Sequence, residues 1–157
     1  MTRKAFFSFR HEPDYWRAIN VRNCWTNNER TVAGFFEPTE WEGVKRQADS
    51  VIATWIDEQL RDTSVTVVLI GIDTAKSKWI EYEINASLAR GNGVLGIYIH
   101  EIKNSKGITT ARGANPLDAL VPARSGSLAY PVYDWFKDDG YTNLNSWIEA
   151  AALVAGN

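Results

Sequence analysis

The chain lacks most of the features of secreted, membrane-bound and disulfide-stabilised proteins. Its 157 residues include one cysteine, Cys24, so no disulfide forms within the chain, and a single thiol is typical of a reducing cytosol. No apolar run reaches the roughly 20 residues of a membrane-spanning helix. The start MTRKAFFSFR is basic but has no apolar stretch long enough for a signal peptide. We therefore predict a cytoplasmic protein that does not contact membranes.

Basic charge and metal-binding residues are equally scarce. The net charge is −2, so there is no basic excess to displace counterions from nucleic acid, and no nucleic-acid partner is expected. The two histidines, His11 and His100, belong to no local group of His, Cys and Asp with the spacing of a metal site. No P-loop and no G-x-G-x-x-G motif occurs. We predict neither a metal nor a bound cofactor.

The composition is that of one globular domain, and one stretch indicates its class. With 45% hydrophobic and 23% charged residues, the chain is expected to form a single domain over residues 1–157. Residues 64–84 read SVTVVLIGIDTAKSKWIEYEI. This pattern is a buried strand, a short polar loop and a helix with Ile80, Ile84 and Leu88 on one stripe, which is half of a parallel α/β unit.

Similar patterns recur along the chain and predict its topology. Strands are expected at 5–9, 32–36, 65–70, 94–99 and 129–133, with Pro131 suggesting an edge position for the last. Helices are expected at 15–23, 39–60, 79–90 and 144–154, and loops at 10–14, 23–31 and 101–127. Thr39 and Glu42 have the spacing of a capping box.

This alternation predicts an α/β fold, a flavodoxin-like doubly wound parallel sheet in the order 2-1-3-4-5. Ligands of such sheets bind beyond the carboxyl ends of the strands, where the strand order switches. In this chain the switch point lies between the first and third strands. Residues 8–11 and 72–79 are therefore expected to face one crevice.

Six segments, in order along the chain, carry a family resemblance: FFSF at 6–9, VRNCW at 21–25, SVTVVLIG at 64–71, WIEYEI at 79–84, GANPLD at 113–118 and VYDWFKDDGY at 132–141. Together they resemble the TIR-like ThsB family of Thoeris antiphage systems. Ser77, Trp79 and Glu83 also have the S-x-W-x-x-x-E spacing of NAD-cleaving TIR domains. The resemblance implies a TIR-like fold and an enzyme that cleaves NAD, its substrate, to nicotinamide and a cyclic ADP-ribose-type second messenger.

The resemblance also implies partners. A phage-derived trigger would switch the enzyme on, and the messenger would activate a separate effector protein. Assembly into a homo-oligomer stays open, because Pro38 is followed by Thr39 where many TIR domains have a Pro-Gly pair. One alternative is a non-catalytic TIR-like protein-interaction module. A receiver or other nucleotide-binding domain is a weaker one, since the first strand ends in Ser8-Phe9-Arg10 and not in acidic residues.

Two glutamates on the same helix compete for the catalytic role. Glu81 and Glu83 lie on opposite flanks of the buried stripe, and helical geometry alone does not choose between them. The resemblance assigns Glu83. A carboxylate beside the ribose would stabilise the positive charge that grows as neutral nicotinamide leaves. The expected substrate-binding residues are Ser8, Phe9, Arg10, Trp41, Ser77 and Trp79.

Several of these residues also have an ordinary structural interpretation. Glu83 could be a solvated helix carboxylate, and Ser77 could cap the helix that follows it. Arg10 could be a surface charge. Trp41 and Trp79 could pack against the sheet, as most tryptophans do.

Overall fold

Five parallel strands form one sheet in a computed structural model that describes residues 3–25, 30–35, 38–120 and 130–157. The spatial order is β2-β1-β3-β4-β5, which confirms the flavodoxin-like order expected from the sequence. The strands are β1 Arg3–Ser8, β2 Arg30–Ala33, β3 Val65–Ile70, β4 Gly93–Tyr98 and β5 Val132–Asp134.

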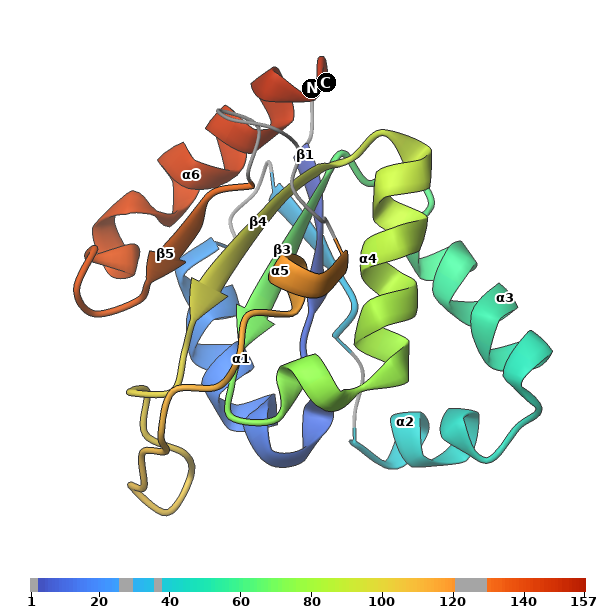
Figure 1. Cartoon of the computed structure of the whole chain (residues 1–157), viewed down its shortest axis with the longest axis horizontal. Helices are drawn as coiled ribbons and strands as arrows, with labels where there is room; N and C mark the ends of the chain where they lie inside the picture. The colour runs from blue at the N-terminus through green and yellow to red at the C-terminus, as the bar shows by residue number, and fades with distance from the viewer. Residues whose placement is uncertain (1–2, 26–29, 36–37, 121–129) are drawn as a thin grey trace.

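Helices cover both faces of this sheet (Figure 1). They are α1 His11–Trp25, α2 Pro38–Lys45, α3 Asp49–Leu60, α4 Lys78–Arg90, α5 Pro116–Leu120 and α6 Gly140–Val154. One buried cluster joins α1 and α6 to the sheet, and two others join α3, α4 and α5 to the opposite face. Within the described ranges, no helix is long and apolar enough to cross a membrane.

The alternation of side chains along β1 decides which face of the sheet Ser8 occupies at the carboxyl end of the strand. Phe7 belongs to the cluster on the α1 and α6 side, whereas Phe6 belongs to the cluster beneath α3. Successive residues of a strand point to opposite faces, so Ser8 shares the face of Phe6. Ser8 is fully buried on this side, where α4 lies.

The prediction of a single helix over 39–60 is wrong, because the chain forms α2 and α3 instead. Ala48 lies between them with the extended angles φ −62° and ψ 150°. A single straight helix over this range would be about 33 Å long at 1.5 Å per residue. A six-residue strand spans only about 20 Å, so such a helix would extend beyond the strands that it covers. Thr39 is the second residue of α2 and not its N-cap, since Pro38 occupies the first helical position.

The prediction that residues 10–14 form a loop holds only in part: α1 spans His11–Trp25, but Glu12 within it has the non-helical angles φ −106° and ψ 120°, and regular helix follows this kink. The amide of Asp14 donates to the carbonyl of Arg10 at 3.2 Å across the kink at Glu12. Asp14 is fully buried and forms an ion pair with Arg17 at 3.0 Å. This buried ion pair fixes the N-terminal part of α1, because Arg17 also donates to the carbonyl of Ile102. The prediction relied on the spacing of apolar residues, which does not reveal a buried pair of charged residues.

Near the C-terminus the elements follow the prediction with shifted boundaries. β5 lies at the sheet edge, as Pro131 suggested. α6 begins four residues earlier than expected, because the side chain of Asp139 caps the amide of Thr142. The expected loop 101–127 contains the short helix α5. Parts of the expected loops and strands, at 26–29, 36 and 121–129, lie outside the described residues.

Candidate functional site

Helix α4 has the boundaries that its capping residues predict. Ser77 precedes it, and the Ser77 hydroxyl accepts a hydrogen bond from the amide of Ile80 at 3.4 Å. Gly91 ends it with a φ of 82°, a left-handed conformation that glycine adopts without strain. Ile80 and Ile84 are buried against the sheet. Glu83 is buried on α4 together with these two isoleucines.

Glu83 is a buried carboxyl group whose hydrogen-bond partner is neutral. Its residue is 7% exposed, and the Ser8 hydroxyl donates to Glu83 Oε2 at 2.5 Å. No ion pair with it occurs among the described residues. Burial raises the pKa of Glu83 to about 8, although the hydrogen bond from Ser8 acts in the opposite direction. The resting carboxyl group is thus largely protonated at pH 7, because the apolar surroundings disfavour its charge.

Next to Glu83 lies a cavity of about 210 Å³, which we call the Glu83 cavity. Its walls come from the residues after β1, from α2 and from α4. The lining residues are Phe9, Arg10, His11, Glu12, Trp41, Lys45, Ser77, Trp79, Ile80 and Glu83. The fold therefore brings together every predicted site residue except Ser8, which touches Glu83 from the strand side. The sequence placed residues 72–79 in this crevice, but only Ser77 and Trp79 of that range line it.

An aromatic wall forms one side of the Glu83 cavity. The ring of His11 stacks on Phe9 with 4.5 Å between centroids and on Trp41 with 5.5 Å. Trp41 in turn contacts Trp55 on α3 at 5.9 Å. Trp41 and Trp79 also pack against the buried cluster beneath α3. Both tryptophans thus have the packing role expected of such residues and a surface on the cavity.

Two cationic side chains lie on the same cavity. Arg10 donates from Nη1 to the carbonyl oxygen of Asp73 at 3.2 Å. Lys45 Nζ forms an ion pair with Glu42 Oε1 at 2.6 Å. Lys45 was not among the predicted site residues, and His11 was expected at the crevice but was given no binding role. The position of Lys45 depends on the break between α2 and α3, and a lone histidine after a strand carries no local signal.

The structure separates the two glutamates that helical geometry left equivalent. Glu81 is exposed and lines a different hollow, together with Tyr98, Asn115 and Asp118. Glu83 is the buried one and faces the aromatic wall. Ser77 lies between these two hollows and lines both.

A five-stranded parallel sheet with helices on both faces, and a cavity beyond its first strand, defines a TIR-like α/β protein of flavodoxin-like fold. The family model described as "Thoeris protein ThsB, TIR-like domain" matches residues 6–104. A protein of Bacillus cereus (strain MSX-D12), named "Putative cyclic ADP-D-ribose synthase ThsB1", is 31% identical over 191 aligned positions. That alignment covers 94% of this chain and all of the relative. The chain belongs to the TIR-like ThsB family of Thoeris proteins.

Proposed function

We propose that this protein is an enzyme that cleaves NAD to nicotinamide and a cyclic ADP-ribose-type second messenger. The observation that carries the proposal is the buried Glu83 beside an aromatic-lined cavity at the carboxyl end of β1. The name of the Bacillus cereus relative supports the same class of product. Glu83 is the catalytic residue in this proposal.

The first step is entry of the positively charged nicotinamide ring beside Glu83. A cation close to a buried carboxyl group favours its ionised form, so substrate binding lowers the pKa of Glu83 from its raised resting value of about 8. The proton leaves to solvent as the substrate enters. The flat faces of Phe9 and Trp79 on the cavity suit an aromatic ring. Ser8 keeps the carboxylate oriented through its hydrogen bond.

The second step is cleavage of the bond between ribose C1′ and the nicotinamide nitrogen. The bonding electron pair goes to nitrogen, and nicotinamide leaves as a neutral ring. The positive charge that develops on the ribose is stabilised by the Glu83 carboxylate. A nucleophilic atom of the same ADP-ribose unit then attacks C1′, and the unit releases one proton to solvent. The product is cyclic, provided that the aromatic walls exclude water from C1′.

Cations of the cavity supply the remaining substrate contacts. Arg10 and Lys45, which line the cavity, would bind the diphosphate of NAD, since guanidinium and ammonium groups both bind phosphate oxygens. The Ser77 hydroxyl, which is engaged weakly at 3.4 Å with the Ile80 amide, has acceptor and donor capacity left for a ribose hydroxyl. Trp41 would cover an aromatic base of the substrate.

Regulation follows from the size of the cavity. A volume of about 210 Å³ is below the roughly 300–1,000 Å³ of pockets that enclose drug-sized ligands. The site must widen, or be completed by a phage-derived trigger or a second copy of the chain, before it holds NAD. We therefore expect low activity of the cytoplasmic enzyme at rest and a rise on infection. The messenger would then activate a separate effector protein.

The test is turnover of NAD by purified protein, with and without lysate from phage-infected cells. Loss of the interaction made by Glu83 in the transition state should cost about 3–4 kcal/mol, hence a rate reduced hundreds-fold in Glu83→Gln. Glu81→Gln, the matched change two residues earlier on α4, should retain most of the activity. Equal turnover by Glu83→Gln and wild type in activating lysate would contradict the catalytic role and favour an interaction module.

The regulatory part of the proposal has its own test. Dilute, monomeric protein should release little nicotinamide, and addition of infected-cell lysate should raise the rate. Full turnover by the monomer alone would remove the requirement for a trigger or for assembly. It would leave the assignment of Glu83 untouched.

A further inference from the structure

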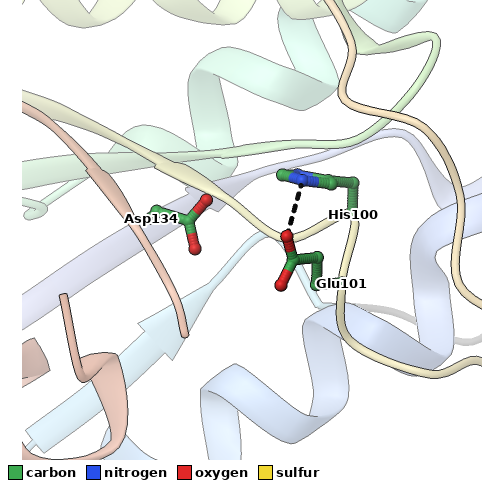
Figure 2. Close-up of side chains that lie close together, drawn as sticks. All are labelled: His100, Glu101 and Asp134. Carbon is green, nitrogen blue, oxygen red and sulfur yellow. Dashed lines mark ion pairs between the residues drawn. The ribbon is translucent and has the colours of Figure 1, made fainter. Parts of the chain in front are cut away.

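Three side chains of types that bind metals in other proteins meet at the carboxyl ends of β4 and β5, on the same edge of the sheet as the Glu83 cavity but not next to β1. His100 and Glu101 follow β4, and Asp134 ends β5. The two strands are parallel neighbours, with Tyr98 paired to Asp134, so their carboxyl ends lie side by side. One potential ligand atom from each of the three residues lies within 4.8 Å of the others. Figure 2 shows the imidazole and the two carboxylates converging on one space.

Two members of this cluster are buried, and one of them, His100, has a buried ring nitrogen that forms no hydrogen bond with any described residue. Asp134 is 8% exposed, and its Oδ1 accepts hydrogen bonds from the amides of Phe136 and Lys137, each at 3.1 Å. Its second oxygen has no hydrogen bond among the described residues. His100 is 7% exposed, and its Nδ1 has no hydrogen-bond partner in the described part of the chain. Buried polar atoms are rarely left unpaired, because each costs about 1–3 kcal/mol.

We propose that His100, Glu101 and Asp134 bind a divalent transition-metal ion, with Zn²⁺ as the best fit. One imidazole and two carboxylates form a mixed nitrogen and oxygen donor set, which zinc accepts and which all-oxygen calcium or magnesium sites do not use. The three protein ligands leave a fourth position for water. None of them lines the Glu83 cavity, so the inference does not depend on the proposed NAD chemistry.

The distances fit such an ion after a small closure. Ligand atoms about 2.0–2.2 Å from a tetrahedral zinc lie about 3.3–3.6 Å from one another. His100 Nε2 and Glu101 Oε1 are already 3.5 Å apart, and the widest separation in the cluster is at most 4.8 Å. Asp134 is held in place by its two backbone hydrogen bonds, whereas Glu101 is exposed and has room to move. The Glu101 side chain is thus the ligand that moves when the metal binds.

A bound metal would add a link between the carboxyl ends of β4 and β5, which are already paired in the sheet. It would also fix residues 100–101, where the segment after β4 begins. A few residues further on, Arg17 from α1 donates to the carbonyls of Ile102 at 2.6 Å and Ile108 at 2.8 Å. The ion and Arg17 would therefore hold the same segment from two sides. An ion that binds the folded state alone, at a free concentration c, raises the free energy of unfolding by RT ln(1 + c/Kd), so the melting temperature rises with the logarithm of its concentration once the site is saturated.

The experiment titrates Zn²⁺ into the full chain after treatment with a chelator, by calorimetry and by thermal unfolding. A Cys24→Ser background removes the thiol as a competing ligand. Asp134→Asn removes the charge but keeps the oxygen that accepts from Phe136 and Lys137, so the turn survives. Glu101→Gln changes an exposed side chain. Glu81→Gln is the control, because it removes an exposed carboxylate elsewhere.

The expected result is one Zn²⁺ per chain and a rise in melting temperature of the background protein. Asp134→Asn and Glu101→Gln should each weaken binding about tenfold or more, while Glu81→Gln leaves it unchanged. Co²⁺ in place of Zn²⁺ should give visible absorption bands of a four-coordinate site. The absence of saturable binding, or the same dissociation constant in both ligand variants as in the background protein, would overturn the proposal.

Discussion

The Glu83 cavity and the cluster of His100, Glu101 and Asp134 both lie at the carboxyl ends of the strands of one sheet. Their carboxyl groups differ in the hydrogen-bond partners that surround them. Glu83 has a neutral hydroxyl as its partner, and burial raises its pKa to about 8. Asp134 accepts two backbone N–H groups and faces an imidazole. The first arrangement destabilises a negative charge until a cation arrives, whereas the second gives one carboxylate oxygen two backbone donors and leaves the other oxygen toward the imidazole. This contrast suits transient contact with a cationic substrate in one place and lasting contact with an ion in the other.

The largest effect is expected where the two regions are connected. Arg17 is fully buried between Asp14 and the carbonyls of Ile102 and Ile108. Arg17→Met leaves Asp14 buried without its cation, and the pKa of Asp14, already raised by burial, loses the opposing influence of Arg17. We expect a loss of about 3–5 kcal/mol in the free energy of unfolding, measured by urea denaturation at pH 7.

The matched control is Arg61→Met, which breaks an exposed ion pair with Glu58. Surface pairs of this kind contribute at most about 1 kcal/mol. A similar small loss in Arg17→Met would mean that the buried pair does not hold α1 to the segment after β4. In that case the two regions would be structurally independent.

The next effect tests the raised pKa of Glu83 through the pH dependence of the free energy of unfolding, and it needs no measurement of activity. Its pKa is about 8 in the fold against 4.5 for an ordinary glutamate, so the folded state binds the proton more tightly than the unfolded state. The stability that this proton contributes is complete below pH 4.5 and is lost as the pH rises through 8. Wild type should therefore lose on the order of 3 kcal/mol relative to Glu83→Gln between pH 5 and pH 8.

Urea unfolding of both proteins across this pH range measures the difference. Glu81→Gln should follow wild type at every pH, because Glu81 is exposed. A constant difference between Glu83→Gln and wild type would show that the Glu83 pKa is not raised. The contrast with Asp134 would then disappear.

A smaller effect is expected from the neutral partner of Glu83. The Ser8 hydroxyl lowers the pKa of Glu83 through its hydrogen bond, so Ser8→Ala should move that pKa further upward. If Glu83 acts as an ionised group, the rate of NAD cleavage should fall about tenfold, with the rising limb of the pH–rate profile shifted to higher pH. A lower rate with an unshifted profile would assign Ser8 to packing alone.

The sequence predicts the sheet well because β3 and β4 are nearly continuous apolar runs and β1 contains the apolar residues 5–7. Burial of a parallel strand on both faces produces such runs. It does not predict the break between α2 and α3, which brings Trp41 and Lys45 to the cavity. The choice between Glu81 and Glu83 depends on what each helix flank meets across the fold: Glu83 is buried against Ser8 on β1, whereas Glu81 is exposed. Likewise, His100 and Asp134 are distant in sequence, so no local spacing reveals their cluster.

The central claim is tested most directly by mass spectrometry of small molecules from phage-infected cells that express the chain. The account predicts a nucleotide one water lighter than ADP-ribose, together with nicotinamide, in cells with wild type or Glu81→Gln. Cells with Glu83→Gln, expressed at the same level, should lack it. The same nucleotide in Glu83→Gln cells would contradict the catalytic role of Glu83, and linear ADP-ribose alone in wild-type cells would contradict the synthesis of a cyclic messenger.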